Sequence, residues 1–396
     1  MPSESFTGGR RAGSMARFPR KPRLPATRPL LDRLRRDHLL QALLALAVAL
    51  AVADPRASHD YLSWLDLPTL SGLCGLLVLA QGVVASGHVQ RFALHLVEHL
   101  RSVRALALVL VLLAAALATV LTNDVALFLV VPLTLAIDRV ARVPRQRLVI
   151  FEALAVNAGS TFSPIGNPQN LLLWQHAGMP FLRFAAAMLP AAAVMFALVA
   201  AFAWWWLPRE RIALTPAHID GRVNSTRLGI GSLLALLAMV LLMEYHHAPL
   251  GAVLLLGLFA LLARRSLARI DWLLLLTFAA IFLGLGHFAE LPLVRDMLGQ
   301  LDFRDPLTLY ASGIVASQLI SNVPATVLLL DRTPDTIALA VAVNVGGFGV
   351  AIGSLANLIA LRLAKQPRGL RLLHLVSIPF LLACAPLVYL AWRWLG

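Results

Sequence analysis

After about residue 38, the chain alternates long apolar runs with short charged connections. A helix needs about 20 mainly apolar residues to span the hydrocarbon core of a bilayer. The pattern predicts spanning helices near 38–54, 68–86, 148–175, 181–206, 228–243, 248–263, 271–290, 336–363 and 373–393. Two further apolar stretches, 105–138 and 306–330, are interrupted by the tripeptides "TND" and "SNV". Each stretch is either two spans or one re-entrant hairpin.

Two apolar regions contain polar segments rich in asparagine and glycine. They are "NAGSTFSPIGNPQN" (Asn157–Asn170) and "NVGGFGVAIGSLAN" (Asn344–Asn357). Proline and glycine end helices, and non-helical backbone at membrane depth is tolerated only where it is buried in protein or lines a cavity. A break leaves carbonyl groups free to bind a cation and a helix N-terminus free to attract an anion. We therefore expect two broken helices at a binding site.

The interrupted stretches and the breaks recur at nearly constant spacing. A shift of 199 residues places Thr122 on Ser321 and Asn123 on Asn322, and a shift of 187 places Asn157–Asn170 on Asn344–Asn357. The helix near 228–243 links the two halves, so equivalent helices point in opposite directions. Inverted repeats with helices broken at matching positions are typical of secondary transporters. A shared site would also explain the matching tips, which favours re-entrant hairpins over exposed loops.

Composition agrees with this fold class. Hydrophobic residues make up 59%, charged residues 14%, and the mean hydropathy is +0.78. We predict an all-α polytopic membrane protein, an inverted repeat with two re-entrant helical hairpins and two broken transmembrane helices. The expected parts are a disordered basic cytoplasmic tail (1–37), a first repeat (38–206), a linker with a connecting helix (207–247) and a second, inverted repeat (248–396).

The net charge of +14 comes from the basic tail and from arginines between apolar segments. Such arginines mark cytoplasmic loops, so we expect a bacterial inner-membrane protein with a cytoplasmic N-terminus and an extracytoplasmic C-terminus. The arginines lack aromatic interleaving and an RNA-binding signature, so nucleic acid is not an expected partner. Cys74 and Cys384 have no metal-type spacing, which argues against a zinc site or a disulfide. The chain also has no Walker A loop for ATP.

Four segments together resemble a known superfamily: "LTNDVALFLVVPL", "NAGSTFSPIGNPQNLLLW", "SNVPATVLLL" and "NVGGFGVAIGSLANLI". They look like the ion transporter superfamily of divalent anion:sodium symporters, arsenical pump membrane proteins and citrate transporter-like proteins, and look closest to a poorly characterised bacterial inner-membrane branch. In the dicarboxylate branch, each tip carries a Ser-Asn-Thr motif that binds the substrate carboxylate and helps bind sodium. Here Asp124 and Val323 occupy the third positions, a departure that argues against a dicarboxylate substrate.

The candidate substrate- and ion-binding residues lie at the tips and the breaks. They are Thr122, Asn123, Asp124, Asn157, Gly159, Ser160, Thr161, Ser163, Gly166, Asn167, Asn170, Ser321, Asn322, Thr326, Asn344, Gly347, Gly353, Ser354 and Asn357. Asp124 is the candidate coupling residue, because a buried carboxylate can take up a proton or a cation. The alternative role of Asp124 is to cap a helix that begins at Val125.

Three other ionisable residues attract attention. Glu152 is either a proton site or the partner of Arg145 or Arg147. His88 and His287 occupy matching positions in the two halves, which indicates either function or packing at the membrane interface.

The sequence therefore predicts an ion-coupled secondary transporter of a small anion, a carboxylate or an inorganic oxyanion, that works by alternating access. Alternatives within transport are arsenite or metalloid efflux, sodium/proton antiport and a channel. An intramembrane enzyme would need an asymmetric catalytic constellation, whereas the polar residues here are duplicated, so no catalytic residue is assigned. We expect no cofactor and no metal site, and Na⁺ or H⁺ as the coupling ion. The expected partners are the lipid bilayer, a small anionic substrate and, as an open option, a second copy in a homodimer.

Overall fold

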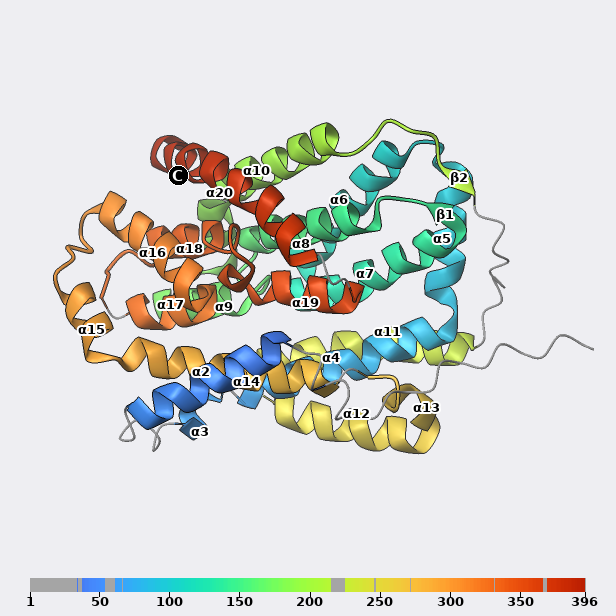
Figure 1. Ribbon diagram of the computed structural model, residues 1–396, viewed down its shortest axis with the longest axis horizontal. Helices are drawn as coiled ribbons and strands as arrows, with labels where there is room; N and C mark the ends of the chain where they lie inside the picture. Colours follow the sequence, from blue (N-terminus) through green and yellow to red (C-terminus); the bar gives the residue numbers. More distant parts are fainter. Residues whose placement is uncertain are drawn as a thin grey trace, which may run out of the picture.

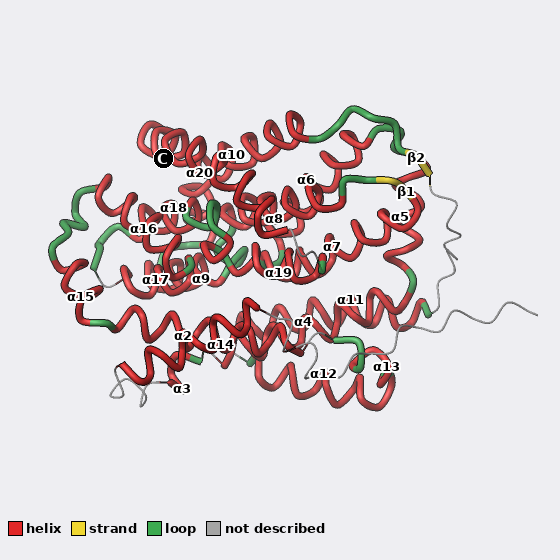
Figure 2. Tube along the Cα trace, in the orientation of Figure 1, coloured by secondary structure: helices red, strands yellow, loops and turns green. Residues whose placement is uncertain are grey.

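The computed structural model describes residue 34 and residues 38–53, 61–65, 67–214, 225–245, 247–270, 272–330, 332–365 and 369–395. The predicted tail, 1–37, lies outside this part of the chain except for Leu34. Almost every described element is a helix. The exceptions are two short strands, β1 (Ala141–Arg142) and β2 (Ala213–Leu214), which pair antiparallel beside the ends of the helices (Figure 2).

The helices form two layers (Figure 1). The first layer, drawn at the bottom, contains α2 (His38–Ala53), α4 (Leu67–Ser86), α11 (Thr226–Glu244), α12 (Ala248–Leu262) and α14 (Trp272–Glu290), with short α3 (Tyr61–Trp64) and α13 (Arg264–Leu267). Helices α5 (His88–His99) and α15 (Pro292–Gly299) connect this layer to the second one at opposite ends of the molecule.

The second layer holds both interrupted stretches and both polar segments. Its helices are α6 (Val103–Val120), α7 (Asn123–Val140), α8 (Arg145–Phe162), α9 (Pro168–Ala177), α10 (Phe181–Trp206), α16 (Pro306–Ile320), α17 (Asn322–Leu330), α18 (Thr336–Val345), α19 (Leu355–Ala364) and α20 (Gly369–Leu395). The expected spans 148–175 and 336–363 are thus each divided into two helices at the polar segment. A 3₁₀ turn, Ala351–Gly353, lies within the second break.

Contacts between the two halves of the chain come in matched pairs. Helix α2 packs against α14, while α12, which the predicted repeat matches with α2, packs against α4. In the second layer, α8 packs against α19 and α18 against α9, and α7 packs against α19 and α17 against α9. Each contact therefore has a counterpart in which the two halves exchange roles.

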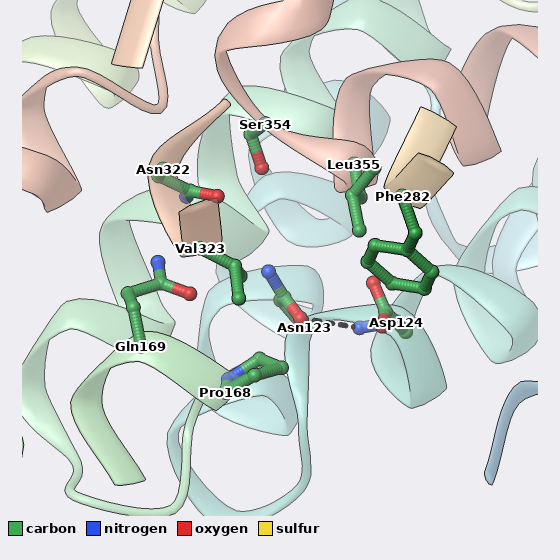
Figure 3. A pocket seen from close by; sticks show the side chains of 9 residues that line it. All are labelled: Asn123, Asp124, Pro168, Gln169, Phe282, Asn322, Val323, Ser354 and Leu355. Atoms are coloured by element: carbon green, nitrogen blue, oxygen red, sulfur yellow. Dashed lines mark hydrogen bonds between the residues drawn. The ribbon is translucent and has the colours of Figure 1, made fainter. Parts of the chain in front are cut away.

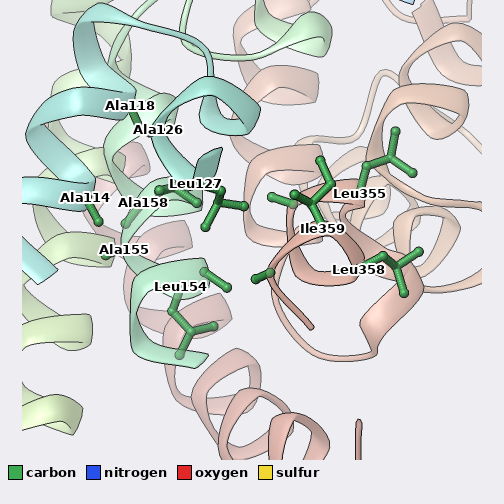
Figure 4. Close-up of a cluster of buried hydrophobic side chains, with 14 of the residues drawn as sticks. Ala114, Ala118, Ala126, Leu127, Leu154, Ala155, Ala158, Leu355, Leu358 and Ile359 are labelled. Atoms are coloured by element: carbon green, nitrogen blue, oxygen red, sulfur yellow. The ribbon is translucent and has the colours of Figure 1, made fainter. Parts of the chain in front are cut away.

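Small residues allow the helices of the second layer to approach closely. Ala114 and Ala118 of α6 lie near Ala155 and Ala158 of α8 in a cluster of buried apolar side chains (Figure 4). At Gly159 a Cβ atom would collide with the backbone of Ala115, so this crossing requires glycine.

Four described helices, α6, α10, α11 (over 226–243) and α20, are long and apolar enough to cross a membrane. Shorter apolar helices include α12, α14 and α16. Many large apolar side chains are exposed on these helices, among them Leu182, Trp205, Leu261 and Leu382. Extensive exposed apolar surface is expected where helices face lipid.

Candidate functional site

A small cavity in the second layer lies where four helices begin (Figure 3). Helices α7, α9, α17 and α19 each contribute residues from their first turn or cap, and α14 of the first layer adds one aromatic ring. The lining residues are Asn123, Asp124, Pro168, Gln169, Phe282, Asn322, Val323, Ser354 and Leu355. The cavity volume is about 10 Å³, which is room for about one water molecule.

The start of α7 is held by its own polar side chains. The hydroxyl of Thr122 caps the helix by accepting from the N–H of Val125 at 3.4 Å. The N–H of Asn123 donates to the carbonyl oxygen of Gly166 at 2.8 Å, which ties the first tip to the first break. Asp124 lies within the first turn, so the expectation that it caps a helix beginning at Val125 is wrong. The cap falls on Thr122 because the helix starts two residues earlier.

Asp124 brings a carboxyl group to the cavity. It is 7% exposed, and Oδ1 has no hydrogen-bond partner among the described residues. Its backbone N–H donates to Oδ1 of Asn123 at 2.9 Å. The carboxyl group and the ring of Phe282 lie side by side in Figure 3. Asp124 is the one acidic residue that lines the cavity.

The second tip has a different local backbone. Ser321 is buried and adopts a φ of 75°, which is unusual for a residue with a side chain. Asn322, 3% exposed, begins α17, and its carbonyl oxygen accepts from the hydroxyl of Thr326 at 2.8 Å. The strained position thus directly precedes a cavity residue, a placement that is common at binding sites.

Asparagines from both halves bond to one another behind the cavity. Nδ2 of Asn157 donates to Oδ1 of Asn357 at 3.2 Å, and Oδ1 of Asn157 accepts from the hydroxyl of Ser354 at 3.1 Å. Nδ2 of both asparagines also lies within hydrogen-bonding distance of the carbonyl oxygen of Gly347, at 3.3 Å and 3.0 Å. These bonds connect the end of α8 to the second break.

A matching set connects the end of α18 to the first break. Nδ2 of Asn344 donates to Oδ1 of Asn170 at 2.6 Å, and Oδ1 of Asn344 accepts from Asn167 at 2.9 Å and from Thr161 at 3.3 Å. Nδ2 of Asn170 is directed at the carbonyl oxygens of residues 160, 161 and 163, at 3.0–3.2 Å. The bonds satisfy carbonyls that the end of α8 leaves free.

Most of the predicted polar side chains fall into two groups. Asn123, Asp124, Asn322 and Ser354 line the cavity. The other asparagines, with Ser160, Thr161 and the carbonyl of Gly347, make the network behind it. Gly166 and Gly353 lie in the two breaks, where a Cβ atom would meet the carbonyl oxygens of Ser160 and Gly346.

The sequence prediction missed five cavity residues. Pro168, Gln169, Val323 and Leu355 each neighbour or follow a predicted residue, so the helix starts could have indicated them. Phe282 comes from α14, outside every repeated motif, and the residues around it in the sequence carry no signal for the site.

Glu152 pairs with neither Arg145 nor Arg147, so that alternative is wrong. Arg145 forms a salt bridge with Asp138 at 2.9 Å, and Arg147 donates to the carbonyl oxygen of Trp206 at 3.0 Å. Glu152 instead accepts a hydrogen bond from the hydroxyl of Thr134. Arg145 and Asp138 face one another across the turn between α7 and α8, which leaves Glu152 deeper in the bundle.

The matched histidines and the metal-type cluster lie apart from the cavity. His287 is buried beside Trp64, with Nδ1 3.3 Å from the hydroxyl of Tyr61, whereas His88 is half-buried at the start of α5. In the described part of the chain, three exposed α5 residues, His95, Glu98 and His99, have ligand atoms within 4.8 Å of one another. None of these residues lines the cavity.

Comparisons with known proteins found a family match and several similar proteins. The citrate transporter family model matches residues 30–335. The inner membrane protein YbiR of Escherichia coli is 40% identical over 361 residues, covering 91% of this chain and 97% of its own. An uncharacterized transporter of Methanocaldococcus jannaschii is 35% identical over 262 residues, 65% of this chain and 70% of its own. The human P protein is 24% identical over 83% of this chain and 53% of its own. The chain belongs to the citrate transporter family, within the ion transporter superfamily that its motifs resemble.

Proposed function

We propose that the protein is an ion-coupled secondary transporter that moves a small anion, a carboxylate or an inorganic oxyanion, across the inner membrane by alternating access. One observation carries the proposal: four helix N-termini, two from each half of the chain, converge on one buried cavity. Family membership supports the transport class, and the likeness to an inner membrane protein supports the location.

The convergence of helix starts favours an anion. Each helix carries a partial positive charge at its N-terminus and presents backbone N–H groups there. Helices α7, α9, α17 and α19 all direct this end toward the cavity. Asn123 and Asn322 add side-chain amides that can donate to oxygen atoms of the anion.

Asp124 supplies the link to an ion. A carboxylate at the cavity would repel an anion unless a proton or a cation neutralised it. Its free Oδ1 is placed to receive either one. Binding of the anion is then strongest when H⁺ or Na⁺ is bound, which couples the two movements.

The matched contacts between the halves support an inverted repeat, and the buried tips support re-entrant hairpins. Asn123 is 4% exposed and Asn322 is 3% exposed, so neither tip is a solvent-exposed loop. In such a repeat, the exchange of packing between halves gives two related conformations that open to opposite sides. The cavity is too small for a carboxylate such as citrate, so the structure resembles a closed state. Because Phe282 belongs to the other layer, we expect the cavity to open when the layers shift.

Sodium/proton antiport is the second candidate, since one carboxyl at a buried site could exchange the two cations. Arsenite efflux has less support, because Cys74 on α4 and Cys384 on α20 do not line the cavity. A ligand screen separates these functions. We would measure thermal stability of purified protein with citrate, sulfate, phosphate or arsenite, with Na⁺ and pH varied, because a ligand that binds the folded state stabilises it.

The second experiment measures transport by the purified protein in proteoliposomes. Accumulation of a stabilising anion against its gradient, driven by Na⁺ or H⁺, is the expected result. Flux only down the gradient would point to a channel. Sodium-driven proton movement without any added anion would favour antiport and refute anion transport.

A further inference from the structure

A second buried carboxyl group lies in α8, away from the cavity. Glu152 is 0% exposed, and every residue of α8 from Leu148 to Thr161 is buried. The residues one turn before and after it on the same helix are Leu148, Val149, Ala155 and Val156, all apolar. The family motifs quoted above do not include Glu152, and the proposed anion site makes no use of it.

The polar surroundings of this carboxyl group are minimal. The Thr134 hydroxyl of α7 contacts Oε1, and Oε2 has no hydrogen-bond partner among the described residues. Arg145, a cation on the same helix, forms a salt bridge with Asp138 instead. No cation of the described chain lies within salt-bridge distance of Glu152.

The helices that pack against α8 are α6, α7, α10, α18, α19 and α20. Their charged residues lie near the helix ends, and α18 has none. Three further titratable groups lie within α20. The complete set is Arg104 of α6, Asp124, Asp138 and Arg139 of α7, Arg183 of α10, Arg362 of α19, and Arg371, His374, Cys384, Tyr389 and Arg393 of α20, with Arg145 and Arg147 of α8 itself. Apart from Asp124 at the cavity, Glu152 is thus the one buried acidic group of these helices.

An ionised carboxylate is costly at a position that is 0% exposed and has no counter-ion within salt-bridge distance among the described residues. A metal cation would require several oxygen ligands, whereas the surroundings offer one hydroxyl. A proton requires no further ligand. The surroundings therefore select a proton.

We propose that Glu152 binds a proton in this closed conformation and releases it when the conformational change admits water. This inference rests on the proposed transport function and deepens it: it names H⁺ as an ion that is coupled to the conformational change. The two carboxyl groups then have separate roles. Asp124 governs binding of the anion at the cavity, and Glu152 carries a proton that is released and taken up as the conformation changes.

A short route to solvent supports this role. Asp138, Pro144 and Arg147 line an open hollow of about 540 Å³ at the turn between α7 and α8. Glu152 follows Arg145 by seven residues on α8, which is about 10 Å along the helix axis. Thr134 is on the same helix as Asp138, one turn deeper. A modest separation of α7 from α8 would admit water from the hollow to the carboxyl group.

Infrared spectroscopy tests the proton directly. Spectra of the full chain in lipid nanodiscs near neutral pH would be compared for the unchanged protein and Glu152→Gln. We expect the variant to lose a carboxylic-acid C=O band. Loss of carboxylate bands instead would show that Glu152 is ionised and overturn the proposal. Asp302→Asn, at an exposed carboxylate in the loop before α16, is the control that should lose carboxylate bands.

Transport tests the coupling. In proteoliposomes, Glu152→Gln should exchange labelled citrate, or whichever anion stabilises the protein, at a rate near that of the unchanged protein. Its accumulation driven by a pH gradient should fall to the level reached without a gradient. Thr134→Val, which removes the hydroxyl, should shift the pH profile of accumulation without abolishing it. Unchanged accumulation in Glu152→Gln would refute the role of this residue. Failure of the unchanged protein to transport any anion would refute the proposed function instead, and the infrared comparison would still decide the protonation of Glu152.

Discussion

Nδ2 of Asn344 donates a 2.6 Å hydrogen bond to Oδ1 of Asn170, although 174 positions separate them in the chain. The shift of 187 residues maps this pair onto Asn157 and Asn357, which form the corresponding bond at 3.2 Å. In both pairs, the helix before the break in one half is hydrogen-bonded to the helix after the break in the other half.

We expect Asn344→Ala and Asn170→Ala each to lower the free energy of unfolding by about 1–3 kcal/mol, because each leaves a buried amide without its partner. The double variant should show a coupling energy of about 0.5–3 kcal/mol. Reversible unfolding in detergent, followed by circular dichroism, measures both. Simple additivity of the two losses would contradict a direct bond.

Gly159→Ala should destabilise the protein by about 1–3 kcal/mol, because the added methyl group meets backbone of α6 that cannot rotate away. The matched control is Gly257→Ala in α12, where nothing lies within 4 Å of the added atom. That variant should be neutral or slightly stabilising. Equal melting temperatures for the two variants would argue against the close crossing of α6 and α8.

Asn123→Ala and Asn322→Ala should each remove the stabilisation that a bound anion gives, while the melting temperature without ligand changes little. For the unchanged protein, an anion at about 100 times its Kd should add about 2.7 kcal/mol. Gln300→Ala, at an exposed loop position, is the control. If both tip variants keep the full ligand-induced shift, the tips do not contact the anion.

Asp124→Asn keeps the size of the side chain at the cavity but cannot titrate or carry a charge. We expect anion binding in this variant to lose its dependence on pH or Na⁺, because no charge remains to be neutralised. The measurement is the anion Kd from thermal shifts over a range of pH and Na⁺. A profile identical to that of the unchanged protein would remove Asp124 from coupling and direct attention to the carbonyls of the breaks.

Asp305 lies outside the membrane-spanning segments and allows a prediction of how stability depends on pH. It caps α16 and accepts from the N–H and the hydroxyl of Thr308 at 2.8 Å and 2.7 Å, and these hydrogen bonds lower the pKa of its carboxyl group. Because the folded pKa lies below the unfolded one, the cap stabilises fully above the unfolded pKa and is lost as pH falls through the folded pKa. The stability difference between the unchanged protein and Asp305→Asn should therefore shrink on acidification to about pH 3. A difference that stays constant would contradict the lowered pKa.

The sequence predicted the helical class and both helix breaks correctly. Long apolar runs specify spanning helices because no other element satisfies its backbone groups in lipid. Proline and glycine mark the breaks at Ser163–Asn167 and near Gly346–Gly353, because helical hydrogen bonding stops at such residues. These are local properties, and a single sequence carries them.

Details that depend on one residue were less predictable. The cap of α7 is Thr122 instead of Asp124, since both residue types favour the position and only the path of the preceding loop chooses between them. Glu152 contacts Thr134 instead of an arginine, because the angle between α7 and α8 directs Arg145 to Asp138. Helix crossing angles depend on packing across whole surfaces.

By itself, the sequence determined which residues are polar at membrane depth and that they recur in two halves. Only the tertiary structure decided how they divide, with Asn123 and Asn322 at the cavity and Asn157 and Asn344 in the network behind it. Phe282 reaches the cavity from the other layer for the same reason. A hydrogen bond or a cavity contact requires atoms within a few ångströms, and for residues far apart in the chain that proximity arises only from packing of the layers.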